Sequence, residues 1–237
     1  MAETTTNAPA AADQTIPFGP QMRTLFNFAP TYHPLNHGSY GTFPKSVFDF
    51  KVQRLRDYEA RDCIYKRFVY PGLLKESRAL VAPLLGAHTD EVVFVPNATS
   101  GVNTVLRNIK WEEGDVIIYP QSIYGACLKS IQSVGEVTPV RGVGVEYLYP
   151  VEDDEIETLF RERVKEARGQ GKNVRMAVFD TIVSIPGVRV PWERMVGVCR
   201  ELGILSLIDG AHAIGHNDMT HTGTMVQPDF LVSNCHK

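Results

Sequence analysis

Two residues in the last thirty positions of the sequence, Asp209 and Lys237, are of types that could do chemistry together. Each follows a short apolar run, because residues 204–208 precede Asp-Gly-Ala-His and residues 230–233 precede Asn-Cys-His-Lys. A lysine amine can hold an aldehyde as a Schiff base, and a carboxylate can keep a pyridine nitrogen protonated so that the ring accepts electrons from a carbanion. The pair therefore predicts a site for pyridoxal 5'-phosphate (PLP).

We expect both apolar runs to be buried strands that end at one edge of a mostly parallel sheet, where open α/β sheets bind their ligands. Residues 96–101, Pro-Asn-Ala-Thr-Ser-Gly, would join another strand to a helix. Free amides at that helix N-terminus, with the hydroxyls of Thr99 and Ser100, could bind a phosphate. The same residues could instead serve only as a helix cap.

Polar residues also follow two further apolar runs. Tyr124 could lie on a flat cofactor ring or donate a phenol proton, or it could be a tyrosine that only packs in the core. Thr181 and Ser184 could reach the same ligand or cap the next turn. Polar groups after four separate strands favour a ligand site over any of these individual alternatives.

A metal site is the alternative for one part of this region. Four residues that can ligate zinc are close in sequence: Asp209, His212, His216 and His221. His212 and His216 would share a face only on a helix, whereas Gly210 and Gly215 favour a turn. We therefore favour His212 as a contact to a ring hydroxyl or a stacking group, and the other two histidines as loop residues.

The elements that must position these residues alternate between helical and extended patterns. Helical spacing predicts helices over residues 46–61, 73–85, 101–109, 124–134, 153–169 and 192–202. Runs rich in Val, Ile and Phe predict strands over residues 91–95, 116–119, 174–179, 205–208 and 230–233. This alternation predicts an α/β fold with three α/β/α layers around a mostly parallel mixed sheet.

Composition fits a soluble globular protein, with 43% hydrophobic and 22% charged residues. The net charge of -3 and the absence of a basic stripe argue against a nucleic-acid partner, and no apolar run approaches the roughly 20 residues that span a membrane. Four cysteines without a Cys-x-x-Cys pair indicate neither a zinc knuckle nor a disulfide framework. We expect a cytoplasmic protein with reduced thiols, in which Cys235 packs beside the cofactor rather than acting as a nucleophile.

Residues 34–237 resemble the class V aminotransferases of PLP fold type I. The resemblance is carried by Leu-Asn-His-Gly-Ser-Tyr-Gly at 35–41, Asn-Ala-Thr-Ser-Gly-Val-Asn-Thr-Val-Leu-Arg-Asn at 97–108, Asp-Gly-Ala-His at 209–212 and Ser-Asn-Cys-His-Lys at 233–237. It implies phosphate contacts from Ala98, Thr99, Asn234 and His236, and contacts to the ring hydroxyl from Ser184 and His212. It also implies that Asp209 pairs with the pyridine nitrogen, that Lys237 bonds the aldehyde and that Tyr124 stacks on the ring.

Within the family the chain looks most similar to the fungal hercynylcysteine sulfoxide lyases of ergothioneine biosynthesis, judged in part by Ser-Ile-Tyr-Gly-Ala-Cys at 122–127. That similarity implies a small amino-acid substrate, removal of its α-proton by Lys237, and β-elimination of a sulfenate with Tyr124 as the acid. Isopenicillin N epimerase-like and cyclising enzymes of fungal secondary metabolism share most of these residues. They are the alternative, together with a noncatalytic protein that binds PLP or pairs with a partner.

Members of the family are longer and continue into a small carboxyl-terminal domain, so we expect these 237 residues to be part of a longer polypeptide. Residues 1–15, rich in Ala and Thr and without Arg or Lys, predict a disordered tail. With an amino-terminal arm this tail makes up residues 1–33, and the resemblance implies a PLP-binding large domain over 34–237. It also implies a homodimer with sites near the interface. Asn36, His37 and Tyr40 could line the substrate entry, or they could be turn and surface residues.

Overall fold

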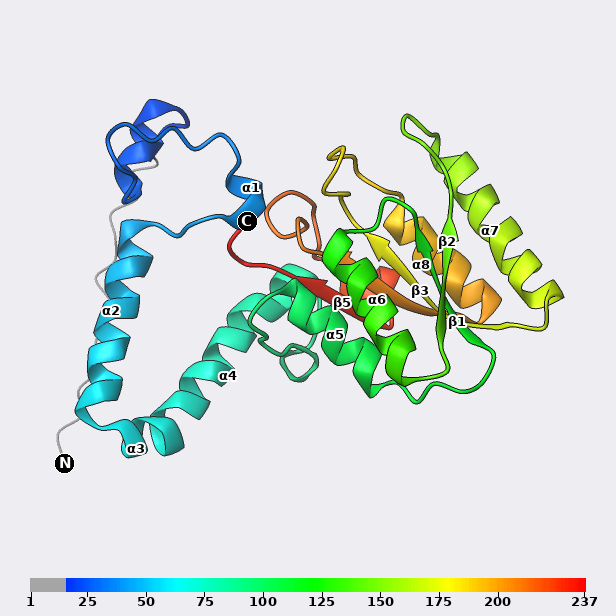
Figure 1. Ribbon diagram of the computed structural model, residues 1–237. Coiled ribbons are helices and arrows are strands. Elements are labelled where there is room, and N and C mark those ends of the chain that lie inside the picture. Colours follow the sequence, from blue (N-terminus) through cyan, green and yellow to red (C-terminus); the bar gives the residue numbers. More distant parts are fainter. Residues whose placement is uncertain (1–15) are drawn as a thin grey trace. The chain divides into compact units, whose positions relative to one another are not determined.

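The structure is a computed structural model that describes residues 16–237, so the tail predicted over 1–15 lies outside the described residues. The chain divides into two compact units, Met1–Asp62 and Cys63–Lys237. Both are drawn in Figure 1. The boundary predicted at residues 33 and 34 stays a prediction.

The first unit contains the 3-10 helix η1 (Pro20–Leu25), the short helix α1 (His37–Tyr40) and the long helix α2 (Lys45–Ala60). Helix α2 confirms the helix predicted over 46–61. In the first unit the three residues predicted to line a substrate entry, Asn36, His37 and Tyr40, are all exposed.

The second unit is built on a five-stranded sheet. Its strands are β1 (Asp115–Pro120), β2 (Arg141–Val145), β3 (Asn173–Asp180), β4 (Leu205–Gly210) and β5 (Phe230–Ser233). Their order is β2-β1-β3-β4-β5, and every pairing between them is parallel. The chain adds β2 on one side of β1 and the later strands on the other, so a topological switch point lies between β1 and β3. Ligands of open parallel sheets bind at the carboxyl ends of the strands at such points.

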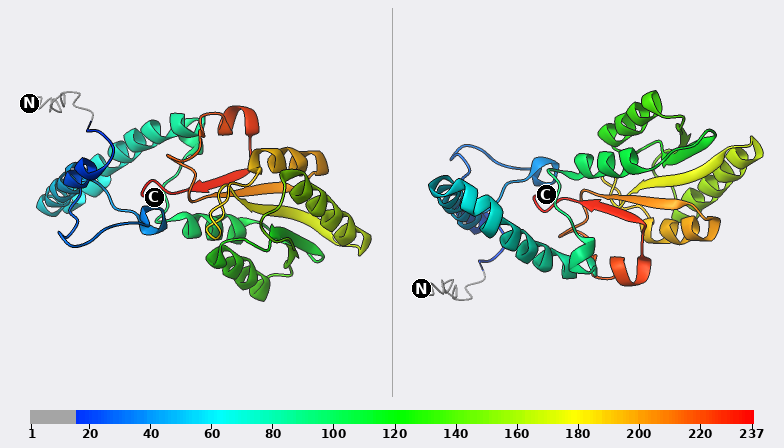
Figure 2. Two further views of the ribbon diagram at one scale, coloured as in Figure 1. Left: turned by 90° about the horizontal axis from the view of Figure 1, so that it is seen from above. Right: turned by 90° about the horizontal axis from the view of Figure 1, so that it is seen from below.

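Helices cover both faces of this sheet and make the three layers that the sequence predicts (Figure 2). Helices α5 (Ala98–Asn108) and α6 (Gly125–Val137) lie on one face, and α7 (Asp153–Gly169) and α8 (Trp192–Leu202) lie on the other. The central strands are almost continuously buried, which is why they read as unbroken apolar runs rather than as alternating ones.

The remaining elements of the second unit are short or precede the sheet. They are α3 (Asp62–Ile64, which begins at the last residue of the first unit), the π-helix η2 (Tyr65–Val69), α4 (Tyr70–Val81), η3 (Ala82–Leu85), η4 (Thr89–Glu91) and the π-helix η5 (Thr222–Val226). Helix α4 with η3 confirms the helix predicted over 73–85. Gly86 ends it in the left-handed conformation with φ +57°, where an added Cβ would meet the Thr220 carbonyl oxygen at 2.0 Å. Among the described residues, no helix has both the length and the hydropathy needed to cross a membrane.

One predicted strand is wrong, and one strand is missed. Residues 92–95 form no strand, because no strand of the described residues pairs with them, and only η4 forms at Thr89–Glu91. Strand β2, which the sequence does not reveal, contains Arg141-Gly-Val-Gly-Val145 at the sheet edge, and most of it is only partly buried. The predicted strands at 116–119, 174–179, 205–208 and 230–233 and the helices over 101–109, 124–134, 153–169 and 192–202 are confirmed.

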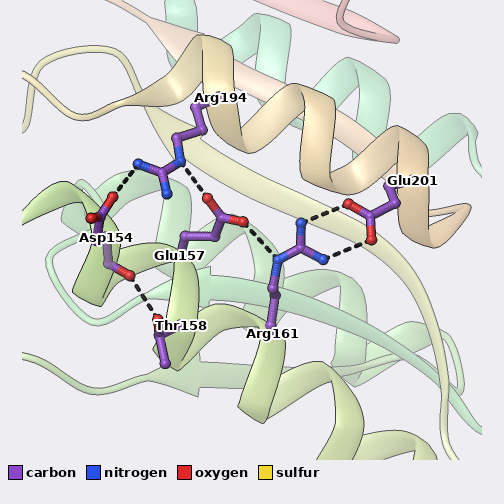
Figure 3. Close-up of polar contacts among 6 residues, drawn as sticks. All are labelled: Asp154, Glu157, Thr158, Arg161, Arg194 and Glu201. Atoms are coloured by element: carbon purple, nitrogen blue, oxygen red, sulfur yellow. Dashed lines mark hydrogen bonds and ion pairs between the residues drawn. The ribbon is translucent and has the colours of Figure 1, made fainter.

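A network of ion pairs joins α7 to α8 on the outer side of their layer (Figure 3). Arg161 donates to both carboxylate oxygens of Glu201 at 3.0 and 2.6 Å and to Glu157 at 2.7 Å. Arg194 of α8 in turn pairs with Glu157 and with Asp154 of α7. Five charged side chains thus hold the two helices side by side above the buried cluster that contains Phe160 and Trp192.

Candidate functional site

Asp209 is the best-anchored polar side chain at the carboxyl edge of the sheet. It is the next-to-last residue of β4 and is buried. One carboxylate oxygen accepts a hydrogen bond from the backbone N–H of Ala211 at 3.0 Å, and the other accepts one from the thiol of Cys127 at 3.0 Å. A buried carboxylate with donors on both oxygens is suited to hold a cation such as a protonated ring nitrogen.

A second buried carboxyl group lies beside it. Asp180 ends β3 and is the register partner of Asp209 in the parallel pair. Burial, and then the charge of Asp209, raise the pKa of Asp180 well above its usual range. One of its oxygens and the hydroxyl of the adjacent Thr181 are buried without a hydrogen-bond partner among the described residues. Buried polar atoms of this kind call for a ligand or water.

The amino terminus of α5 and the segment after β5 are joined by Asn234. Its side-chain oxygen accepts a hydrogen bond from the Ala98 N–H at 3.1 Å, and its side-chain nitrogen donates to the Ala211 carbonyl at 3.4 Å. One buried asparagine therefore connects the predicted phosphate site to the turn after Asp209.

One backbone amide in the first turn of α5 has no acceptor among the described residues. Asn97 caps the helix, since its side chain accepts from Ser100 N–H at 2.8 Å and its carbonyl from Gly101 N–H at 3.1 Å. Ala98 N–H is taken by Asn234, so Thr99 is left as the residue whose amide has no acceptor among the described residues. The helix cap predicted for residues 97–100 is confirmed, and it leaves the Thr99 amide open. Phosphate binding there stays a prediction.

Lys237 and Asp209 both act on His212, which places the three side chains in one neighbourhood. The pKa of His212 is lowered, first by burial and then by the positive charge of Lys237, while the Asp209 charge opposes the shift. His212 is therefore neutral near pH 7, with one ring nitrogen that donates a hydrogen bond and one that accepts. This neighbourhood joins the two motifs, Asp-Gly-Ala-His and Ser-Asn-Cys-His-Lys, that are separate in the sequence.

Close packing at glycines brings these segments together. A Cβ at Gly210 would meet the Val232 carbonyl oxygen at 2.9 Å, and a Cβ at Gly101 would meet the Val232 side chain at 2.7 Å. The Ser233 hydroxyl donates to the Gly210 carbonyl at 2.5 Å. Strands β4 and β5 and helix α5 therefore approach one another as closely as backbone permits.

Tyr124 stands at the switch point, immediately before α6. Its carbonyl accepts the first bonds of α6 from Cys127 and Leu128, and its backbone N–H partly offsets the raised pKa of the Asp180 carboxyl group. The side chain is 45% exposed, so it is a tyrosine facing outward at the strand end rather than one packed in the core. That exposure leaves the ring and hydroxyl available to a ligand.

Several predicted site residues are not joined to this group of side chains by the described contacts. Ser184 lies in the exposed turn between the bridge residues Ile182 and Arg189, and His236 is also exposed. Asn36, His37 and Tyr40 belong to the other unit. The roles of these five residues stay predictions.

Sequence reasoning misses two residues of the site, Cys127 and Asp180. Each lies far from Asp209 in the sequence, and only the sheet register and the placement of α6 bring the three together. A usable signal was present for Cys127, which belongs to the buried stripe of α6 with Ile131 and Val134.

Among the described residues, no group of three or more His, Cys, Asp or Glu side chains is placed to hold a metal.

The residues present fit PLP. The open Thr99 amide suits the phosphate, the anchored Asp209 carboxylate suits the pyridine nitrogen, and Lys237 is a primary amine in the same neighbourhood. The buried, unpartnered atoms of Asp180 and Thr181 lie at the same strand ends. The donor set is that of a ligand with one anionic end and one cationic ring atom.

Comparisons with known proteins agree with this fit. The chain is 38% identical over 226 residues to the L-cysteine desulfhydrase-like protein lolT1 of Epichloe uncinata, which covers 94% of this chain and 48% of that protein. It is 34% identical over 225 residues to the hercynylcysteine sulfoxide lyase of Schizosaccharomyces pombe, covering 93% and 54%. The chain thus spans about half the length of these curated relatives.

The fold is similar to that of C-DES, solved as a mutant with glycine covalently linked to its PLP cofactor. The TM-score is 0.77 at 15% identity, over 90% of this chain and 55% of that one. The family model described as Aminotransferase class-V matches residues 71–237, a range that includes Asp209, Lys237 and the amino terminus of α5. Because that match covers well over half of the sequence, this chain belongs to the class V aminotransferase family.

Proposed function

We propose that this chain carries the cofactor-binding part of a PLP-dependent carbon–sulfur lyase. The observation that supports this most directly is that the charges of Asp209 and Lys237 both act on His212 at the carboxyl edge of the sheet, next to a helix amino terminus held by Asn234. The names of two relatives, a desulfhydrase-like protein and a sulfoxide lyase, favour a bond to sulfur as the one that breaks.

Different residues would hold different parts of the cofactor. Bound PLP would supply an electron sink for a carbanion at the substrate α-carbon. Asp209 would hold a proton on the ring nitrogen, and the Thr99 amide and hydroxyl with the α5 dipole would bind the phosphate. Neutral His212 would contact the ring hydroxyl, and Tyr124 would stack on the ring. Ala98, Asn234 and His236 would complete the phosphate end, and Ser184 the ring hydroxyl.

The reaction needs two proton transfers and one bond cleavage. The Lys237 amine takes the α-proton of a cysteine S-conjugate, and the C–S bond breaks with its electron pair leaving on sulfur. Tyr124, as the exposed acid at the site, donates a proton to that sulfur group. The three-carbon fragment is released and hydrolyses to pyruvate and ammonia. Within this class we propose a cysteine sulfoxide of the hercynylcysteine type, for which the leaving group is a sulfenate.

The experiment is a comparison of Lys237→Ala with Lys172→Ala, an exposed lysine in the turn before β3. The purified protein is titrated with PLP, reduced with borohydride and assayed for pyruvate from L-cysteine and from cysteine sulfoxides. We expect a reduced adduct on Lys237 and pyruvate release, both lost in Lys237→Ala and kept in Lys172→Ala. Pyruvate from Lys237→Ala at the unaltered rate would contradict the proposed mechanism.

The same assay separates the alternatives. An epimerase returns the proton to the opposite face, so an amino acid of inverted configuration accumulates without pyruvate, and a cyclising enzyme gives a ring product. Protein that takes up no PLP and yields no adduct would support the noncatalytic alternative. The homodimer and the longer polypeptide stay predictions, which light scattering and the intact mass decide.

A further inference from the structure

Cys127 is a buried thiol that the proposed chemistry does not use. It is fully buried in the first turn of α6, and its Sγ donates a hydrogen bond to the Asp209 carboxylate at 3.0 Å. The other Asp209 oxygen is held by Ala211 N–H at 3.0 Å. The two donors approach from different elements, so together they fix the carboxylate in rotation and position.

The alternation of the strands explains why a helix residue reaches this carboxylate. Met176 and Val178 of β3 and Leu207 of β4 belong to the buried cluster beneath α5 and α6. Asp180 and Asp209 continue that alternation two positions later and are register partners, so both carboxyl groups face the same helix layer. The first turn of α6 therefore lies over them.

The position of Cys127 on α6 follows from helical spacing. Cys127, Ile131 and Val134 are buried at intervals of four and three residues, which makes one stripe along the helix. The two apolar members pack on the sheet, and Cys127 is the member nearest the strand ends. A thiol serves there as a small apolar residue that can also donate one hydrogen bond.

The thiol is held in its protonated form. Burial, and then the charge of Asp209 and the hydrogen bond to it, raise the pKa of Cys127 far above its ordinary value. A thiol that keeps its proton can donate to a carboxylate but cannot act as a nucleophile. Cys127 is thus suited to positioning and unsuited to covalent catalysis.

Two groups beside Asp209 are held in their neutral forms. The raised pKa of Asp180 favours its neutral form beside Asp209. His212 is kept neutral by burial and by the positive charge of Lys237.

We propose that Cys127 is a positioning residue that orients the Asp209 carboxylate toward the pyridine nitrogen of the cofactor through its Sγ–H to Oδ2 hydrogen bond. This inference rests on the proposed role of Asp209 in cofactor binding. Cys127→Ala removes the donor to one Asp209 oxygen, so the whole carboxylate group is less restrained in rotation. Cys127→Ser keeps a donor at nearly the same place, and Cys199→Ala removes a buried thiol of α8 that packs on the opposite face of the sheet.

The first measurement is made on cofactor-free protein and does not depend on activity. The infrared S–H stretching band of Cys127 is obtained as the difference between the unaltered protein and Cys127→Ala. We expect it below the frequency of the Cys199 band, and we expect Asp209→Asn to raise it, because an amide oxygen accepts more weakly than a carboxylate. If the Cys127 band has the same frequency as the Cys199 band and does not shift in Asp209→Asn, the proposed hydrogen bond is refuted.

The second measurement is the PLP dissociation constant. We expect Cys127→Ala to weaken PLP binding by about tenfold, as loss of a hydrogen bond to a charged group implies, with Cys127→Ser returning to within about threefold and Cys199→Ala unchanged. Equal affinity in Cys127→Ala, or no recovery in Cys127→Ser when its thermal unfolding matches the unaltered protein, would refute the positioning role. If the unaltered protein binds no PLP, the proposed function fails, and the infrared band still decides the hydrogen bond.

Discussion

The side-chain oxygen of Asn234 accepts a hydrogen bond from the backbone N–H of Ala98, a residue 136 positions earlier, at 3.1 Å. This bond joins the amino terminus of α5 to the segment that carries Lys237. A second hydrogen bond, from the Asn234 side-chain nitrogen to the Ala211 carbonyl at 3.4 Å, connects the same side chain to the turn after Asp209. The three parts of the candidate site are thus tied together by one buried side chain.

Asn234→Ala should therefore weaken both stability and cofactor binding. It leaves the Ala98 amide and the Ala211 carbonyl without their partner, and a buried unsatisfied group costs about 1–3 kcal/mol. Denaturant unfolding and PLP titration measure the two effects. Asn108→Ala is the matched control, because its exposed amide only bonds the Thr104 carbonyl within α5. Equal losses in the two variants would contradict a special role for Asn234.

Two glycine substitutions in helices should have opposite signs. A Cβ at Gly101 in α5 would meet the stiff Val232 side chain at 2.7 Å, so Gly101→Ala should destabilise the fold by about 1–3 kcal/mol. A Cβ at Gly197 in α8 would meet nothing within 4 Å. Gly197→Ala should therefore stabilise by about 0.5–1 kcal/mol through helix propensity. Thermal unfolding of both variants tests the pair, and a Gly101→Ala protein as stable as the unaltered one would contradict the close α5 to β5 contact.

Glu157→Gln should reduce stability by at most about 1 kcal/mol, because Glu157 links Arg161 and Arg194 in an exposed network (Figure 3). Hydrogen bonds from Arg161 lower the pKa of Glu157 below 4.5. A depressed folded-state pKa gives stability that is present above 4.5 and lost as the pH falls through the folded value. The difference between the two proteins should hence shrink at acid pH and at high salt.

Glu162→Gln is the control for that network, since Glu162 lies on α7 and forms no ion pair with a described residue. Its unfolding free energy should follow the unaltered protein across the same pH and salt range. If the two variants lose the same stability at every pH, the ion pairs between α7 and α8 contribute nothing measurable.

His212→Gln should flatten the pH dependence of stability just below neutrality. Burial and the charge of Lys237 lower the pKa of His212 below 6.5, so the folded protein binds fewer protons than the unfolded chain. Stability is therefore unaffected above 6.5 and declines as the pH falls toward the folded value. Urea unfolding of cofactor-free protein between neutral and mildly acid pH measures the slope. A slope that persists in His212→Gln must come from other groups.

Sequence patterns predict the elements of this fold well where helices and strands are regular. The spacing in α7 and α8 gives their observed bounds, because both helices bury one clear apolar stripe. Strand β2 is missed because its two glycines read as a loop. The structure supplies the reason at Gly142, where a Cβ would meet the ring of Tyr119 at 2.9 Å, so a strand residue must be glycine there.

The candidate site is predicted in its motifs but not in its contacts. Asp209, His212 and Lys237 stand out in the sequence because each follows a strand with a distinctive short motif. The contact of Cys127 with Asp209 spans 82 residues and depends on the register of β3 with β4 and on the placement of α6. No local pattern encodes such a contact, since it arises only when the sheet and its helix layer are assembled.

The bond between Ala98 and Asn234 also has a consequence for the order of folding. Closing a segment of 136 residues carries a large entropic cost, which is repaid only when β5 has docked beside β4. Helix α5 can form from local contacts, but we expect its amino terminus to be fixed only after β5 has docked. A cofactor that binds at this position would bind only molecules whose sheet is already assembled. It would therefore slow unfolding without accelerating the early steps of folding.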